Sequence, residues 1–166
     1  MNYETTKQVL EKLKPYIDTE QINILTENTD WKGKKYNSDL VKLDEKHDVS
    51  FEVTERSIIV FYFTDHEHFD NFTSEEDDVE YIDWAIEFLI NLFTLPIRHV
   101  EKYKGKKLSS EKYYFINNDF EECTSGIISY GCVRLINPFA KRSYKSETWK
   151  YDAEAKMFVN DAIITK

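Results

Sequence analysis

The segment 65–68, Asp-His-Glu-His, carries the residue types best suited to metal chemistry in this chain. If the preceding strand continues through it, His66 and His68 project to one face and the two acids to the other. Two imidazoles on one face bind zinc or another borderline metal when further ligands complete the site. The candidate third ligands are His47, His99 and Asp70. Because no motif places any of them beside the pair, we expect a polar loop here, without a metal or cofactor.

A second possible chemistry is acid–base catalysis by Asp83 and Glu87, which lie one turn apart on an expected helix. Both belong to the polar stripe of that helix, where contact with solvent is a sufficient explanation. The chain has no GxSxG, HExxH, GxGxxG or P-loop motif. Cys123 and Cys132 form no CxxC pair, and we expect buried, reduced thiols. We therefore predict no catalytic residue.

Charge is distributed unevenly along the chain, which has 31 acidic residues, 22 basic residues and a formal net charge of −9. Residues 57–97 contain ten acids and no Lys or Arg. The acids that crowd the region before the expected helix and its first turn are Asp65, Glu67, Asp70, Glu75, Glu76, Asp77 and Asp78. They form either an acidic patch that attracts a basic protein or a solvated loop that complements the helix dipole. The first alternative makes these seven residues the candidate partner-binding site.

A basic cluster follows at residues 102–114, where five lysines are interleaved with three tyrosines. This pattern fits either a small nucleic-acid patch or a hairpin tip whose lysines prevent edge pairing. We favour the hairpin, because a net charge of −9 disfavours binding to nucleic acid and to anionic membranes.

The most strongly patterned element is a helix over residues 74–94. Thr73 and Glu76 form a capping box, and Pro96 ends the helix. Its polar positions fall within an arc of about 80°. These positions are Glu80, Asp83, Glu87, Asn91 and Thr94. The other positions, Trp84 among them, are apolar, so we expect this helix to be buried on most of its circumference.

Strand patterns dominate the rest of the chain. Residues 49–53 alternate between apolar and polar, and residues 57–63 form a continuous apolar run, typical of a central strand. Further strands are expected at residues 97–103, 112–116, 127–136, 148–151 and 157–159. The turns between them predict hairpins and therefore antiparallel pairing.

The N-terminal part of the chain is less regular. Apolar residues at helical spacing predict a helix over residues 6–14 and a second short helix over residues 18–25. Segment 28–46 is charged and weakly patterned, so we expect loop or edge structure there. Together the patterns predict a single α+β domain over residues 1–166. In it a curled antiparallel sheet packs around one long buried helix, 74–94, with a short N-terminal helix.

The composition also bears on the source and compartment. The sequence shows neither a secretory signal nor an apolar stretch long enough to cross a bilayer, so we expect a cytoplasmic protein. Lys, Asn, Ile, Tyr and Phe are abundant, while there are 4 Gly and 3 Pro. This usage is typical of AT-rich coding DNA and favours a low-GC bacterium, a phage or a similar genome as the source.

These features favour a non-enzymatic acidic binding protein, most concretely an immunity or antitoxin-like inhibitor of a basic, nuclease-like bacterial protein. In this hypothesis the acidic patch steers the partner, and Trp31 or Tyr36 anchors it. One alternative is a small-ligand-binding protein or enzyme whose pocket lies between the curled sheet and the long helix. Another is an oligomeric module that pairs through sheet edges. We expect neither a nucleic-acid nor a membrane partner, and a monomer or weak homodimer.

Overall fold

The structure of this chain is a computed structural model. It describes residues 2–20, 22–31, 34–70, 80–117, 120–129 and 141–165, and side chains there except at 29–36, 80, 120–129 and 161–165. The chain divides into two compact units. Unit 1 comprises Met1–Phe93 and Ala153–Met157, and unit 2 comprises Thr94–Asp152 and Phe158–Lys166. The single domain over residues 1–166 stays a prediction.

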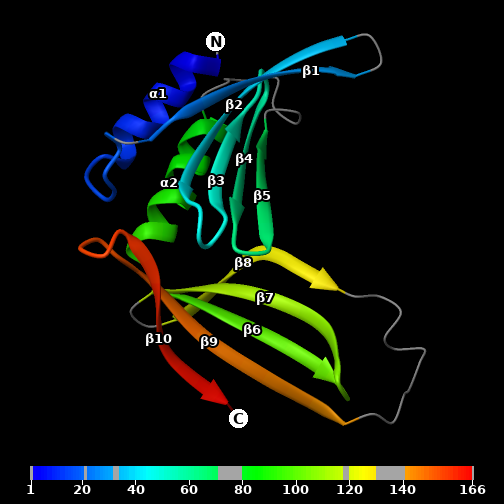
Figure 1. Ribbon diagram of the computed structural model, residues 1–166. Helices are drawn as coiled ribbons and strands as arrows, with labels where there is room; N and C mark the ends of the chain where they lie inside the picture. The colour runs from blue at the N-terminus through cyan, green and yellow to red at the C-terminus, as the bar shows by residue number, and fades with distance from the viewer. Residues whose placement is uncertain are drawn as a thin grey trace. The chain divides into compact units, whose positions relative to one another are not determined.

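Unit 1 has two helices and five strands among its described residues (Figure 1). In chain order they are α1 (Asn2–Leu13), β1 (Ile24–Trp31), β2 (Lys34–Asp44), β3 (Val49–Val53), β4 (Ser57–Tyr62), β5 (Asp65–Asp70) and α2 (Glu80–Thr94). The sheet order β1-β2-β3-β4-β5 follows the sequence, and each neighbouring pair is antiparallel. Unit 1 therefore contains a meander of local strand pairs. The strands expected at residues 49–53 and 57–63 are confirmed as β3 and β4.

Side chains and backbone bonds, rather than glycine, fix two turns of this meander. In the β2–β3 turn, Asp44 Oδ1 accepts hydrogen bonds from the backbone N–H groups of Lys46 at 2.9 Å and His47 at 3.3 Å. Asp48 completes this turn with a φ of 56°. The backbone N–H of Phe63 donates to the carbonyl of His47 at 2.9 Å. This bond ties the β4–β5 turn to the β2–β3 turn and so fixes the point at which β5 begins.

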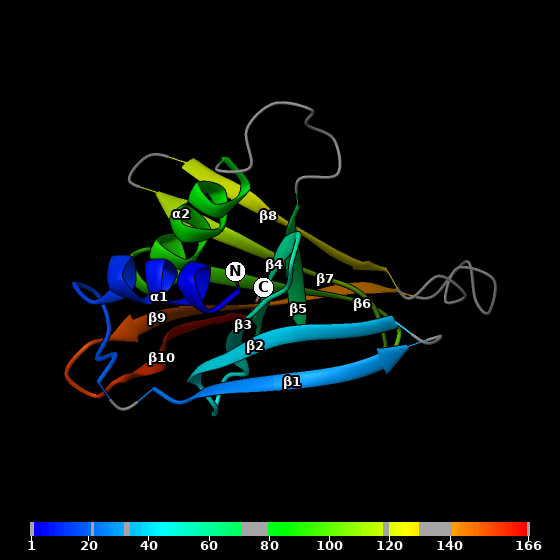
Figure 2. The same ribbon diagram turned by 90° about the horizontal axis from the view of Figure 1, so that it is seen from above.

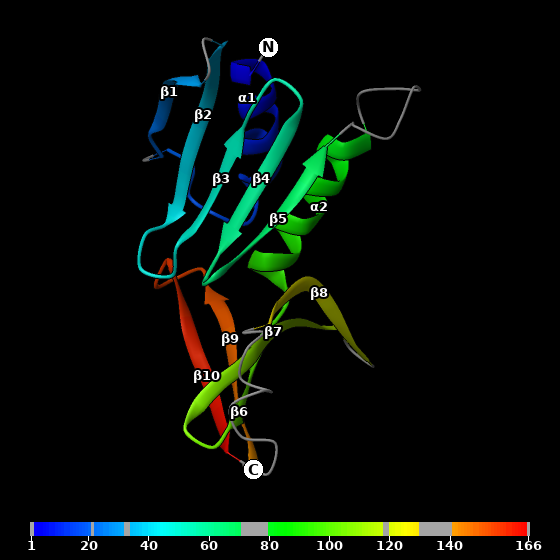
Figure 3. The same cartoon turned by 90° about the vertical axis from the view of Figure 1, so that its right-hand side faces the viewer.

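One face of the first sheet carries the core of unit 1. Its buried apolar side chains include Val41, Phe51, Val53, Ile58, Val60 and Tyr62. From α1, the Thr6 hydroxyl donates to Asp39 on this face at 3.1 Å. From α2, the Phe88 ring lies 5.3 Å from that of Tyr62 and 5.5 Å from that of Phe69. Both helices therefore cover the same face of the sheet, as Figures 2 and 3 show.

Unit 2 contains a second five-stranded sheet among its described residues. Its strands are β6 (Ile97–Lys104), β7 (Lys107–Asn117), β8 (Phe120–Ser129), β9 (Arg142–Asp152) and β10 (Met157–Thr165), in the order β10-β9-β6-β7-β8. The β6–β7 hairpin turns at Gly105, whose φ of 64° suits glycine best. The hairpin expected for the lysine-rich segment is therefore confirmed. Residues 130–136 of the strand expected at 127–136 lie outside the described residues.

The predicted arrangement of sheet and helix is wrong. The strands form two separate sheets rather than one curled sheet, and α2 packs on a face of the first sheet instead of lying inside a curl. The helix has 15 described residues, Glu80–Thr94, and residues 74–79 lie outside the description. The physical reason is local pairing. The strands before α2 complete one meander, and those after it pair among themselves.

The N-terminal predictions have mixed outcomes. The first helix is confirmed as α1, but the described residues of the second, 18–20 and 22–25, form no helix. Instead, Asp18 Oδ1 accepts a hydrogen bond from the Glu20 N–H at 3.1 Å, and β1 begins at Ile24. Segment 28–46, expected to be loop or edge structure, supplies part of the edge strand β1 but also β2, which lies inside the sheet. Pairing of β2 with both neighbours supplies the order that its sequence pattern lacks.

Candidate functional site

The segment 65–68 forms most of β5, the edge strand of the first sheet, and is not a loop. Its two histidines lie on one face and its two acids on the other, as predicted. Asp65 and Glu67 lie opposite Tyr62 and Val60, which are buried. Both acids are consequently half-buried on the face that the helices cover.

The seven predicted partner-binding acids do not share one surface. Asp65 and Glu67 lie on the helix-covered face, whereas strand alternation places Asp70 on the opposite face. The other four, Glu75, Glu76, Asp77 and Asp78, lie outside the described residues. Their role in steering a partner stays a prediction.

Glu67 occupies a position that disfavours its ionised form. Burial of this side chain and the adjacent negative charge of Asp65 raise the pKa of Glu67. Asp65 Oδ1 accepts a hydrogen bond from the His66 N–H at 2.8 Å, while its buried Oδ2 has no hydrogen-bond partner among the described residues. Ionised Glu67 therefore lowers the stability of the fold at neutral pH.

Replacing Glu67 by glutamine is expected to raise the midpoint of urea unfolding at pH 7. Because the folded-state pKa lies above the ordinary value of 4.5, the wild type loses stability as the pH rises through the folded-state pKa. Well below pH 4.5 the side chain at position 67 is neutral in both the wild type and the glutamine variant. The difference between their urea midpoints should then disappear. Glu27→Gln, at an exposed position of β1, is the matched control and should show no such gain. A gain that persists unchanged below pH 4.5 would contradict this assignment.

The His66–His68 pair is exposed, with ring centroids 5.0 Å apart. No described Cys, His, Asp or Glu completes a three-ligand group with these two imidazoles. Of the candidate third ligands, His47 is buried and engaged elsewhere, with Nδ1 2.9 Å from Asp44 Oδ2. Two ligands alone do not make a structural zinc site.

The exposed side of α2 combines an aromatic ring with two carboxylates. Trp84 is 51% exposed, and both Asp83 and Glu87 are exposed beside it. We call these three residues the α2 surface. The expectation that Trp84 is buried is wrong. A signal for its exposure was present, because at 100° per residue Trp84 lies only about 20° outside the polar arc of this helix.

Several predicted residues cannot be assigned contacts from the described part of the chain. Trp31 and Tyr36 belong to β1 and β2, but their side chains lie outside the description. The same holds for the side chain of Cys123 in β8 and for the whole of Cys132. The anchoring role of the two aromatic residues and the reduced state of the thiols stay predictions.

An open cavity of about 750 Å³ lies in unit 1. It is lined by Asn2, Tyr3, Thr26, Asn37, Asp39, Glu55 and Arg56. The buried carboxylate of Asp39 accepts hydrogen bonds from the hydroxyl groups of Thr6 at 3.1 Å and Thr26 at 2.8 Å. This carboxylate therefore serves to join α1, β1 and β2. The lining includes no residue of α2, so this cavity is not the pocket expected beside the long helix.

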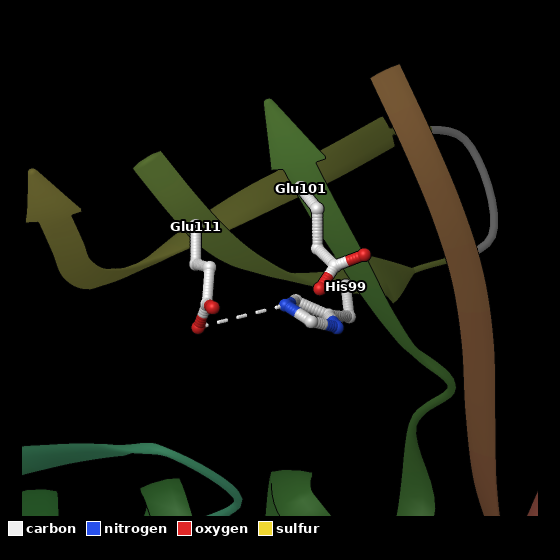
Figure 4. Close-up of side chains that lie close together, drawn as sticks. All are labelled: His99, Glu101 and Glu111. Atoms are coloured by element: carbon white, nitrogen blue, oxygen red, sulfur yellow. Dashed lines mark ion pairs between the residues drawn. The ribbon is translucent and has the colours of Figure 1, made fainter. Parts of the chain in front are cut away.

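Unit 2 brings together His99, Glu101 and Glu111, which no sequence motif groups (Figure 4). Glu101 of β6 lies directly opposite Glu111 of β7, and His99 is two residues before Glu101 on the same face. One ligand atom from each residue lies within 4.8 Å of the others. The side chains are 16%, 17% and 8% exposed for His99, Glu101 and Glu111. The group is thus largely withdrawn from solvent.

Strand β9 adds an ammonium and a third carboxylate to this face. Lys145 forms an ion pair with Glu147, and its Nζ lies 3.6 Å from Glu101 Oε2. The Tyr103 hydroxyl donates to the same Glu101 oxygen at 3.1 Å. We call His99, Glu101, Glu111, Lys145 and Glu147 the His99 cluster.

The surroundings of His99 favour the neutral form of its imidazole. Burial lowers the pKa of His99, although the charges of Glu101, Glu111 and Glu147 partly oppose this effect. The ring stacks on Tyr113 with centroids 4.6 Å apart. Its buried Nε2 has no hydrogen-bond partner among the described residues and lies 3.8 Å from Glu111 Oε2. A neutral imidazole with such a nitrogen is a competent metal ligand.

Comparisons with known proteins find no matching family model, no matching curated protein and no matching solved structure. Neither helix in the described ranges has the length and apolarity needed to cross a membrane. The function is therefore inferred from the side chains themselves.

Proposed function

We propose that this chain is a non-enzymatic acidic binding protein that recognises a cationic protein in the bacterial cytoplasm. Its most concrete form is an immunity or antitoxin-like inhibitor of a basic, nuclease-like protein. The observation that carries the proposal is the exposed ring of Trp84 on the same side of α2 as the exposed carboxylates of Asp83 and Glu87.

The charge around the α2 surface suits a cationic partner. Residues 57–97, which include all of α2, contain ten acids and no Lys or Arg. A field of one sign raises the rate at which an oppositely charged protein associates and disfavours partners of like charge. Asp83 and Glu87 would therefore steer the partner. The acids that precede α2 in the sequence and share this predicted role are Glu75, Glu76, Asp77 and Asp78.

Trp84 supplies what charge alone does not, a large apolar contact. Tryptophan is enriched among the few interface residues that contribute most of the binding energy. An Arg or Lys placed over its ring gains a cation–π interaction as well. An exposed tryptophan flanked by acids therefore matches a partner whose binding surface presents basic side chains.

The test is affinity capture from a lysate of the source organism with two baits, the wild type and the triple variant D83N/W84A/E87Q. The proposal predicts that the wild type retains a basic protein near one-to-one stoichiometry at about 0.1 M salt. It also predicts that the triple variant loses this protein. Recovery of the same proteins by both baits, or recovery of no basic protein, would contradict the proposal. The variant Y144A, which alters an exposed aromatic residue of β9, is the control bait and should behave as the wild type.

A further inference from the structure

We propose that His99, Glu101 and Glu111 form a binding site for one divalent transition-metal ion of the Zn²⁺ type. The juxtaposition that carries this inference is an imidazole and two carboxylates on one face of a β-sheet, with ligand atoms within 4.8 Å of one another (Figure 4). This site lies in unit 2 and is independent of the α2 surface.

The backbone holds these ligands in place. Glu101 and Glu111 are cross-strand neighbours on β6 and β7, and β6 also pairs with β9 along its whole length. Two carboxylates directly opposite each other on a sheet repel, and this arrangement destabilises the strand pair. A cation bound between them converts that repulsion into attraction.

The net charge of the His99 cluster suits the binding of a divalent cation. The His99 cluster has three carboxylates, those of Glu101, Glu111 and Glu147, and one ammonium, that of Lys145, which pairs with Glu101 and Glu147. These four side chains therefore have a formal charge of −2, which one divalent ion would balance. Tyr103, which donates to Glu101 Oε2, would orient that carboxylate from outside the ligand shell.

The distances fit a small ion after modest side-chain rotation. In a tetrahedral zinc site with bonds of about 2.0–2.2 Å, neighbouring ligand atoms are about 3.4 Å apart. His99 Nε2 and Glu111 Oε2 are 3.8 Å apart, so this pair requires a slight closure, and the separations of up to 4.8 Å within the group require a larger one. Nε2 is buried and makes no hydrogen bond to a described residue, so metal binding displaces no described hydrogen bond there.

The ligand types select the class of metal. Imidazole nitrogen favours zinc and related transition ions, whereas Mg²⁺ and Ca²⁺ favour all-oxygen sites. Three protein ligands leave a fourth position for water, as in zinc sites that are not closed. We therefore expect Zn²⁺ to bind more tightly than Mg²⁺ or Ca²⁺.

Isothermal titration of chelator-treated full-length protein with Zn²⁺ tests the site. The wild type should bind one high-affinity equivalent in the micromolar range or tighter, and Mg²⁺ should not compete. His99→Gln and Glu111→Gln should each weaken binding at least about tenfold. The matched control is the double variant H66Q/H68Q, which alters the exposed histidine pair and should retain that equivalent. No binding by the wild type, or binding lost in H66Q/H68Q and kept in His99→Gln, would overturn the proposal.

A measurement on the unaltered chain guards against variants that fail to fold. The protein has 4 histidines, so the imidazole protons give a small set of NMR signals. Zn²⁺ should shift the signals of His99, and those of buried His47 should stay in place. Zinc-induced shifts confined to His66 and His68 would overturn the proposal.

Discussion

Replacing Leu89 by alanine is expected to lower the free energy of unfolding by about 2–5 kcal/mol. Replacing the half-buried Trp84 by alanine is expected to lower it by less, about 1–2 kcal/mol. The physical reason is burial on α2, because Leu89 is 0% exposed and Trp84 is 51% exposed. Hydrophobic stabilisation scales with the apolar area removed from water, so the smaller side chain contributes more. Urea unfolding followed by far-ultraviolet circular dichroism measures both values.

Two further variants complete this comparison. Leu92→Ala removes another fully buried leucine of α2 and should resemble Leu89→Ala. Leu89→Val deletes less volume and keeps the comparison measurable if the alanine variant does not fold. A loss for Trp84→Ala as large as that for Leu89→Ala would mean that Trp84 packs in the core. That result would remove the α2 surface as a binding site.

The largest expected effect on binding comes from the same tryptophan. Once the cationic partner is isolated by capture, Trp84→Ala should weaken its binding by at least about 2 kcal/mol, or about 30-fold in Kd. Most of this loss should appear as faster dissociation, because the removed contact acts after the proteins have docked. Surface plasmon resonance provides both rate constants. Trp84→Phe should retain part of the affinity, since it keeps an aromatic face.

The two acids of the α2 surface should affect binding differently. The double variant D83N/E87Q should slow association at about 0.1 M salt and have little effect at about 1 M, where the Debye length falls to about 3 Å. The Trp84→Ala effect should persist at both salt concentrations, because apolar contacts are not screened. An effect of D83N/E87Q that is equal at both concentrations would contradict a steering role.

The sequence predicts those parts of the fold that depend on local pattern. The alternation in residues 49–53 and the apolar run that follows correspond to β3 and β4. The turn at Gly105 and the following lysines correspond to the β6–β7 hairpin. In each case neighbouring residues supply the whole signal, through period-two burial or a turn that requires positive φ.

Elements that are ordered by pairing with another strand, and not by their own residue pattern, escape the same reasoning. The acidic and histidine-rich β5 is polar enough to suggest a loop, but pairing with β4 makes it a strand. The weakly patterned β2 is likewise ordered by β1 and β3 on either side. The division of the strands into two sheets is a property of these pairings. No residue pattern within a single strand predicts which sheet that strand joins.

The His99 cluster could not be predicted from the sequence, because one extra residue in a strand changes the register that forms it. Counting outward from the turn at Gly105 without a bulge would pair Glu101 with Ser110. A bulge between Lys102 and Tyr103 shifts the register, so that Glu101 lies opposite Glu111 instead. A one-residue shift moves every side chain of a strand to the other face of the sheet. No residue pattern in the hairpin predicts this bulge. The sequence alone therefore does not place Glu111 on the same face as His99.

The central claim, that the α2 surface binds a cationic protein, is tested most directly by ¹⁹F NMR of protein labelled with fluorotryptophan. The chain has 3 tryptophans, and the variant Trp84→Phe assigns the Trp84 signal by its absence. Titration with the captured partner should shift the Trp84 signal and reduce its response to solvent exchange from H₂O to D₂O. Trp149, in β9 of unit 2, provides an internal reference in the same spectrum. A complex that forms while the Trp84 signal keeps both its position and its solvent response would contradict the claim.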